Sequence, residues 1–332
     1  MNVKALIRRV NHTLKLHKLF PEHSRILIAC SGGPDSMALL HLLQDIAAHR
    51  HTKYKLGIAI VDHSIRPESK DEVLWLRNQI DALGLSFYTT TFDVPALSKD
   101  LKLSEETVGR QVRYQWLNEI AQSEGYDYIA VAHHKDDQAE SILAHLIRGT
   151  GLNGLTGMAV VSNDYDIPVI RPLLDVTKAE LLAYLADRKL TYCIDSTNDD
   201  IRYQRNRIRH RIIPELESIN PNVVDAIARL GGSVSEDLAV ISDLTVQAFK
   251  RLVTIDKGEM RLSRRALRKE PLAIQRRLWQ RLVSSIDSDI TLTTAHQEQL
   301  LDIVNTGEAK TFTIKSIKVI AQCDTIKVYC KH

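Results

Sequence analysis

The sequence predicts an α/β protein, in which a parallel-sheet domain is followed by a smaller, mainly helical domain with terminal strands. Two observations predict this class. Strand-like and helix-like segments alternate from residue 25 to about residue 190, as they do in βαβ units. Beyond about residue 215 the alternation stops, and long segments with helical periodicity follow.

Each expected element has its own signal. Short runs of apolar, β-branched or aromatic residues predict parallel strands at residues 25–30, 55–61, 86–92 and 127–132. Ser104, followed by two acids, predicts the start of a helix that reaches Ser123. Helices are also expected at 135–148 and after the capping box Thr177-x-x-Glu180.

The C-terminal part is expected to hold helices at 222–252 and 272–286, and strands at 310–314 and 325–329. The pair Gly231-Gly232 is a point where the first of these helices could break. Pro214 and Pro221 flank a short polar stretch, so we expect one domain over residues 1–218 and another over 219–332.

Composition narrows the class of protein. Hydrophobic residues make up 44% of the 332 residues, which is enough for a core. No apolar run reaches the ~18 residues of a membrane span, and the N-terminal segment lacks the apolar run of a signal peptide. We therefore expect a soluble cytoplasmic protein with no membrane contact. The four cysteines show neither zinc spacing nor a disulfide framework, and the net charge of +3 is modest.

The segment Ser31-Gly32-Gly33-Pro34-Asp35-Ser36 lies between the first predicted strand and a predicted helix. The glycines let the backbone approach an anion, and the first turn of the helix offers unpaired N–H groups at the positive end of its dipole. Asp35 stands where a Walker A motif has its lysine. A carboxylate beside a polyphosphate requires a divalent metal, so the loop predicts nucleotide binding with Mg²⁺. An ordinary strand-to-helix turn is the alternative.

Polar side chains also follow two other predicted strands, at the edge where open parallel sheets bind ligands. They are Asp62 and His63 after the second strand, and His133, His134, Asp136, Asp137 and Glu140 after the fourth. On a helix, residues 137 and 140 share a face and could ligate a metal or act as a base. Alternatively, the acids interact with the positive end of the helix dipole, and the histidines form hydrogen bonds with the backbone. Arg110 and Arg113 could reach phosphates or pair with Glu106.

Two segments carry mostly one sign of charge, as binding to nucleic-acid phosphates requires. Residues 202–211 hold five arginines and no acid, and residues 257–281 hold nine basic residues against two acids. A solvated helix face would normally mix both signs. The residues expected to bind RNA are Arg202, Arg205, Arg207, Arg209, Arg264, Arg265, Arg268 and Arg276.

The segments SGGPDS, VDHSIRPES, ETVGRQVRY, HHKDDQAES, RGTGLNGL, RPLL, DSTN and RNRIR occur in this order between residue 25 and about residue 213. Their order and spacing resemble the tRNA(Ile)-lysidine synthase family of N-type ATP pyrophosphatases, the PP-loop superfamily. Gly109, where alanine is expected, and Ser141, where threonine is usual, depart from that pattern. The resemblance implies a Rossmann-like PP-loop domain that binds ATP over residues 1–218 and a tRNA-binding domain over residues 219–332.

The family's reaction implies that ATP adenylates O2 of the wobble cytidine, position 34, of tRNA(Ile) with a CAU anticodon and that pyrophosphate leaves. The ε-amine of L-lysine then attacks C2 and expels AMP, which gives lysidine. The residues expected to bind ATP are Ser31, Gly32, Gly33, Pro34, Asp35, Ser36, Asp62, His63 and Arg113. Those expected in catalysis are Asp35, His133, Asp137 and Glu140, and the three acids among them are expected to hold Mg²⁺.

Some alternatives stay open at this level. His133 or one of the acids could deprotonate lysine, and a carboxylate could equally orient the ammonium group. A PP-loop tRNA thiolase would activate a base in the same way but deliver sulfur, although neither Cys30 nor Cys193 is an evident carrier. A non-catalytic, nucleotide-binding regulator that associates with RNA would not need Asp137 and Glu140. The sequence also leaves homodimerisation open.

Overall fold

The computed structural model describes residues 3–48, 53–64, 69–193, 204–256, 258–306 and 308–331. The chain forms two compact units, Met1–Gly232 and Ser233–His332. The expected ATP-binding role of residues 1–218 and the expected tRNA-binding role of residues 219–332 stay predictions. Among the described residues, no helix combines the length and the apolar character that a membrane crossing requires.

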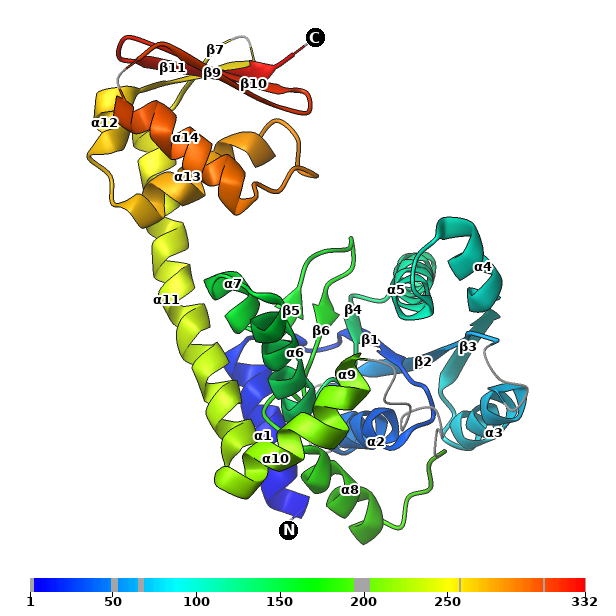
Figure 1. Cartoon of the computed structure of the whole chain (residues 1–332). Coiled ribbons are helices and arrows are strands. Elements are labelled where there is room, and N and C mark those ends of the chain that lie inside the picture. The colour runs from blue at the N-terminus through cyan, green and yellow to red at the C-terminus, as the bar shows by residue number, and fades with distance from the viewer. Residues whose placement is uncertain are drawn as a thin grey trace. The chain divides into compact units, whose positions relative to one another are not determined.

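The first unit is built on a sheet whose strand order, over the described residues, is β3-β2-β1-β4-β6-β5 (Figure 1). Neighbouring strands are parallel except for β5 and β6. The strands are β1 (Arg25–Ala29), β2 (Lys55–Asp62), β3 (Ser86–Thr91), β4 (Tyr128–Ala130), β5 (Val161–Ser162) and β6 (Val169–Ile170). The four parallel strands expected from the sequence are therefore confirmed, and the two short strands β5 and β6 were not foreseen.

Helices connect these strands. They are α1 (Val3–Leu16), α2 (Pro34–Ala48), α3 (Ser69–Ala82), α4 (Val94–Leu101), α5 (Glu105–Ser123), α6 (Lys135–Arg148), α7 (Leu152–Leu155), α8 (Lys178–Asp187), α9 (Gln204–Arg207), a π-helix (Ile208–Ile212) and α10 (Ile213–Ile219). The expected start signals are confirmed. The Ser104 side chain accepts a hydrogen bond from the Thr107 N–H at 3.2 Å, and Thr177 and Glu180 form a reciprocal capping box.

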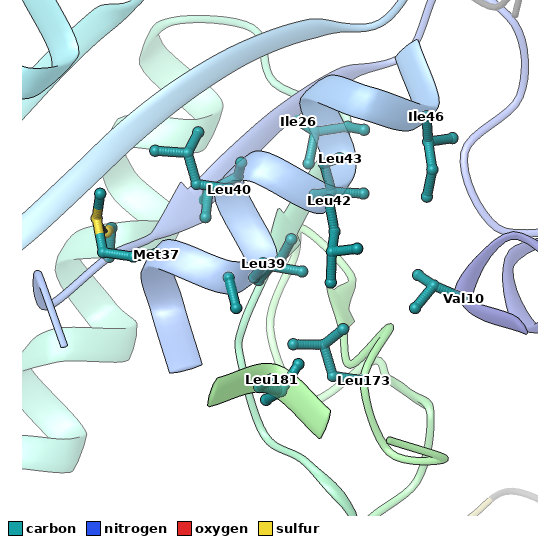
Figure 2. Close-up of a cluster of buried hydrophobic side chains, with 14 of the residues drawn as sticks. Val10, Ile26, Met37, Leu39, Leu40, Leu42, Leu43, Ile46, Leu173 and Leu181 are labelled. Atoms are coloured by element: carbon teal, nitrogen blue, oxygen red, sulfur yellow. Dashed lines mark hydrogen bonds between the residues drawn. The ribbon is translucent and has the colours of Figure 1, made fainter. Parts of the chain in front are cut away.

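The sheet is covered on both faces, which explains why its central strand β1 is apolar over Ile26, Leu27 and Ile28. Ile26 and Ile28 of β1 face one core cluster together with residues of α1, α2 and α8, and Figure 2 shows the leucines of α2 in that cluster. Leu27, which lies between the two isoleucines and points to the opposite face, packs with Tyr114 and other residues of α5. This packing fixes the C-terminal end of β1 and the loop that follows it.

The second unit contains a five-stranded antiparallel sheet among its described residues, in the order β7-β8-β11-β10-β9. The elements are the C-terminal part of α11 (Val223–Leu252), β7 (Thr254–Asp256), β8 (Glu259–Ser263), α12 (Arg264–Arg268), α13 (Leu272–Ser284), α14 (Thr294–Thr306), β9 (Lys310–Ile314), β10 (Ile317–Gln322) and β11 (Thr325–Cys330). The expected helices and terminal strands are present. β7, β8 and β10 were not expected from the sequence, and α11 runs through Gly231-Gly232 without a break.

Candidate active site

A cavity of about 450 Å³ lies in the first unit at the C-terminal ends of β1, β2 and β4. Seven of the residues that the sequence singles out line it: Ser31, Asp35, Ser36, His63, Arg113, His133 and Asp137. Arg205 and Arg209, which were expected to bind RNA, line the same cavity. Gly32, Gly33, Pro34, Asp62 and Glu140 are not among its lining residues. The tertiary structure therefore brings the phosphate loop, the histidine and acid motif and the first basic segment to one place.

The loop between β1 and α2 is closed by its own serines. The Ser36 hydroxyl donates to the Gly33 carbonyl at 2.9 Å and accepts from the Ser31 N–H at 3.2 Å. Gly32 has φ +78°, a conformation that side chains rarely adopt, and its carbonyl accepts from the Cys193 N–H at 2.9 Å. This closed turn places the N-terminus of α2 against the cavity, as an anion-binding loop requires.

Asp35 lies at the N-terminus of α2 with its two oxygens in different surroundings. Oδ2 lies 3.5 Å from Lys178 Nζ and 3.6 Å from His134 Nε2. Oδ1 is buried and has no hydrogen-bond partner in the described part of the chain. A buried carboxylate oxygen without a partner is costly, so the site is incomplete without a ligand for it.

The paired histidines differ in their electrostatic surroundings. Burial alone would lower the pKa of His134, but Asp136, Asp35 and Asp137 raise it to about 9, so it is a cation at neutral pH. His134 is 1% exposed and its Nε2 lies 3.4 Å from Asp137 Oδ2. Burial, together with nearby arginines, lowers the pKa of His133 to about 3. His133 is therefore neutral, and its Nδ1 is buried without a partner among the described residues.

The acids of α6 are held by arginines from the basic segment. Asp137 Oδ1 accepts from Arg205 Nη2 at 2.7 Å, and Glu140 accepts from Arg205 Nε at 2.8 Å and from Arg209 Nε at 2.6 Å. Asp137 and Glu140 are 7% and 1% exposed. Burial raises the pKa of Asp137, but His134 and Arg205 outweigh it and keep the carboxyl ionised. Arg205 and Arg209 thus pair with two buried acids, while their side chains keep 38% and 25% of their exposure.

The donors present are compatible with a divalent cation. Within the described ranges, no three His, Cys, Asp or Glu side chains are arranged to hold a metal by themselves. Mg²⁺ commonly binds one or two carboxylates and completes its shell with substrate phosphates and water. Asp35 Oδ1 is the oxygen that fits this role, since the oxygens of Glu140 and Asp137 Oδ1 already accept from arginines. Asp35, Asp137 and Glu140 all stay predictions as metal ligands.

The remaining residues expected at the ATP site divide into two groups. His63 and Arg113 line the cavity, and burial and Arg113 lower the pKa of His63 to about 4. Asp62 is buried, and its Oδ1 accepts from the Ser64 N–H at 2.8 Å, which holds the turn after β2. Arg113 is 5.3 Å from the centroid of the Tyr114 ring.

Two residues at this site were not expected from the sequence. Lys178, at the start of α8, supplies a positive charge beside Asp35, although the loop itself carries no lysine. Tyr114, on α5, lines the cavity. The helix-start signal at Thr177 located Lys178 in the chain but gave no sign of its contact with residue 35, which depends on how α8 packs against α2.

The arginines expected to bind RNA lie in several environments. Arg202 falls outside the described residues, and Arg207 is exposed. In the second unit, Arg264 is 3% exposed and donates to the Glu308 carbonyl at 2.7 Å, so it supports the fold and cannot reach a phosphate. The proposed RNA-binding set therefore excludes Arg264.

The other arginines of the second unit keep some exposure. Arg268 donates to backbone carbonyls at the end of α14, and Arg276 pairs with Glu298 at 2.8 Å. The Arg265 side chain is exposed and makes no ion pair with a described residue. Among Arg265, Arg268 and Arg276, Arg265 is consequently the arginine most available to a phosphate.

Comparison with known proteins places this site in a family. Residues 4–216 match the family model of the PP-loop domain. The tRNA(Ile)-lysidine synthase of Porphyromonas gingivalis is 38% identical over 227 residues, which are 68% of this chain and 48% of that protein. The enzyme of the same name from Thermosipho africanus is 38% identical, with 74% of this chain and 56% of that protein covered. The chain thus spans about half the length of these relatives.

A third relative is matched along most of its length. The tRNA(Ile)-lysidine synthase of Nostoc is 33% identical over 297 residues, which are 84% of this chain and 83% of that protein. Among solved structures, the U34-tRNA thiolase of Methanococcus maripaludis superposes with a TM-score of 0.59 at 20% identity, over 70% of this chain and 78% of that one. That likeness concerns the fold. The chain belongs to the PP-loop family and, within it, to the tRNA(Ile)-lysidine synthases.

Proposed function

We propose that this protein is an ATP-dependent ligase that joins L-lysine to C2 of the wobble cytidine of tRNA(Ile) with a CAU anticodon, in the cytoplasm. The observation that carries the proposal is one cavity that collects the closed phosphate loop, Asp35, His133 and Asp137. Membership in the tRNA(Ile)-lysidine synthases supports the choice of substrates.

The loop Ser31–Ser36 is the proposed site for the ATP phosphates. The backbone N–H groups of its glycines and of the N-terminus of α2 can donate hydrogen bonds to the anionic oxygens, and Lys178 adds a positive charge beside Asp35. Asp35, with Asp137 next, would hold Mg²⁺, which neutralises the pyrophosphate leaving group when it is bound. These groups favour attack of the cytosine O2 on the α-phosphorus, with release of pyrophosphate.

The second step takes place on the adenylated cytidine. Asp137, which lines the cavity, is proposed to orient the lysine ammonium, while Glu140 is engaged by Arg205 and Arg209. The ammonium passes a proton to Asp137 or to His133, the amine attacks C2, a C–N bond forms, and the C2–O2 bond breaks with AMP as the leaving group. His133, whose Nδ1 has no protein partner among the described residues, offers a hydrogen bond to the substrates.

The RNA must place one unpaired base at this cavity, which loop nucleotides do at low cost. Exposed Arg207 and Arg265 are proposed to contact phosphates of the tRNA. Arg205 and Arg209 bind the acids instead, so in the present arrangement they are lining groups of the cavity.

The alternative of sulfur transfer is disfavoured by the cysteines. Burial raises the pKa of the Cys30 thiol, and desolvation raises that of Cys193 as well, so neither is an activated thiolate. A regulator without catalysis would need the phosphate loop but not Asp35 Oδ1, which is buried and has no hydrogen-bond partner among the described residues.

One experiment separates these functions. The protein is incubated with ATP, Mg²⁺, labelled lysine and unmodified tRNA(Ile), and the label in the RNA is counted, with a tRNA lacking cytidine 34 as the control. Incorporation that requires both ATP and cytidine 34 supports the ligase. ATP binding without incorporation would contradict the ligase. A parallel reaction with labelled sulfide in place of lysine then separates the two alternatives, because label in the RNA would support the thiolase and its absence would support the regulator.

A further inference from the structure

The wall of the cavity contains a tyrosine whose hydroxyl is unused. Tyr114 is 1% exposed and lines the cavity, and its Oη is buried without a hydrogen-bond partner among the described residues. Arg171 is the side chain beside this hydroxyl and can only donate to Tyr114 Oη, so the O–H hydrogen of Tyr114 has no acceptor among the described residues. A buried O–H donor without an acceptor destabilises a fold, so its presence in a cavity wall points to a bound group.

The ring of Tyr114 is held firmly in place. It stacks on Tyr165 with a centroid distance of 5.4 Å and an interplanar angle of 10°. The guanidinium groups of Arg110 and Arg113 lie 4.8 Å and 5.3 Å from its centroid. These contacts limit how far the ring can turn, so the hydroxyl cannot find another partner by a small rotation.

The surroundings of the ring favour an anionic partner. Arg113 lines the cavity, and burial lowers its pKa, which reflects a cation with little compensation from the protein. Arg171 has a lowered pKa for the same reason, with one hydrogen bond from Nη1 to the Ala159 carbonyl. Asp137 and Glu140, the nearby acids, are already paired with Arg205 and Arg209. This side of the cavity therefore has positive charge and a free O–H donor, and needs an acceptor.

We propose that Tyr114 Oη and Arg113 together bind an anionic oxygen of a substrate. The ligand group is a carboxylate oxygen of lysine or a phosphate oxygen of ATP, both of which accept strong, charge-assisted hydrogen bonds. The proposal rests on the proposed function for the identity of these two substrates. Tyr114 is then a substrate-binding residue that fixes orientation, and its hydroxyl is without a partner because that partner arrives with the substrate.

The proposal predicts opposite effects of one substitution on stability and on binding. Tyr114→Phe keeps the ring, its stack on Tyr165 and its contacts with the arginines. In the protein without substrate the change removes a buried hydroxyl with no partner, so the midpoint of thermal unfolding stays equal or rises. With substrate it removes a hydrogen bond to a charged group, which corresponds to a tenfold or greater rise in KM for that substrate.

Tyr165→Phe is the matched control, because it removes a hydroxyl from the partner ring, which is not among the residues that line the cavity. KM is measured for lysine at saturating ATP and for ATP at saturating lysine, and unfolding midpoints are measured with each ligand alone. A rise in KM for lysine in Tyr114→Phe identifies the lysine carboxylate as the partner of Tyr114. A rise in KM for ATP identifies a phosphate oxygen as that partner. Both constants should stay near the wild-type values in Tyr165→Phe.

The outcomes distinguish this inference from the proposed function. Absence of lysine transfer in the wild-type protein overturns the proposed function, while the ligand-induced unfolding shifts still test Tyr114. The inference is supported if lysine or ATP raises the midpoint of thermal unfolding less in Tyr114→Phe than in the wild type. Equal shifts and equal KM values in the two proteins overturn it, as does a drop in the midpoint of the ligand-free variant, which would show that the hydroxyl supports the fold.

Discussion

Arg209 holds Glu140 through two hydrogen bonds, from Nε to Oε1 at 2.6 Å and from Nη2 to Oε2 at 3.0 Å. Glu140 is 1% exposed and also accepts from Arg205. The pair joins the segment after residue 203 to α6, and so closes one side of the candidate active site. The same contacts convert a segment that reads as a surface for RNA into part of the cavity wall.

Glu140→Gln should lower the free energy of unfolding by about 3 kcal/mol, because removal of one partner leaves buried cations uncompensated. Urea denaturation of the whole chain measures the change. Arg209→Met alone should also destabilise, and the double variant should lose less than the sum of the two, since the second change removes the charge that the first left alone. A strictly additive double variant would show that the two residues do not interact.

Asp35→Asn should abolish incorporation of labelled lysine into tRNA, by more than about a hundredfold, because the amide cannot supply an anionic oxygen to Mg²⁺. Binding of tRNA, measured by filter retention at fixed salt, should stay close to the wild-type value. Asp81→Asn, at an exposed position on α3, is the control and should retain activity. Near-normal turnover of the Asp35→Asn variant would show that Asp35 does not bridge metal and phosphate.

Lys178→Met should weaken ATP binding by about tenfold, since the loop then loses the positive charge that lies 3.5 Å from Asp35. The backbone N–H of residue 178 still donates to Asp136, so the start of α8 should be unchanged. Isothermal titration calorimetry with ATP measures the change in affinity. Lys99→Met, in the exposed part of α4, should bind ATP as the wild type does; an equal loss in both variants would indicate only a general effect of net charge.

The adjacent glycines of α11 should respond in opposite directions to alanine. A Cβ on Gly231 would lie 2.8 Å from Ile142 Cδ1 and 3.1 Å from the Thr156 carbonyl, so Gly231→Ala should destabilise by about 1–3 kcal/mol. Nothing lies within 4 Å of a Cβ on Gly232, and Gly232→Ala should stabilise by up to about 1 kcal/mol through helix propensity. The unfolding midpoints of the two variants are compared with that of the wild type. A shift of the same sign in both variants would contradict the packing of α11 on α6.

The sequence by itself determined the local structure and the loop chemistry. Runs of apolar, β-branched or aromatic residues defined β1 to β4, Ser104 and Thr177 marked helix starts, and the Ser31–Ser36 segment marked a strand-to-helix turn that we expect to bind an anion. These features depend on backbone sterics, capping and neighbours a few residues away, which a sequence shows directly. Short strands such as β5 and β6 carry too few residues for such a pattern.

Only the tertiary structure decided which charges meet. Lys178 reaches Asp35 across 143 residues of chain, and Arg205 reaches Glu140 across 65. A basic run has the same appearance in a sequence whether it binds phosphate or neutralises buried acids, and Arg264 shows a third outcome by lying inside its unit. Burial sets the energy of each charge, and burial depends on how distant helices pack, which no local pattern encodes.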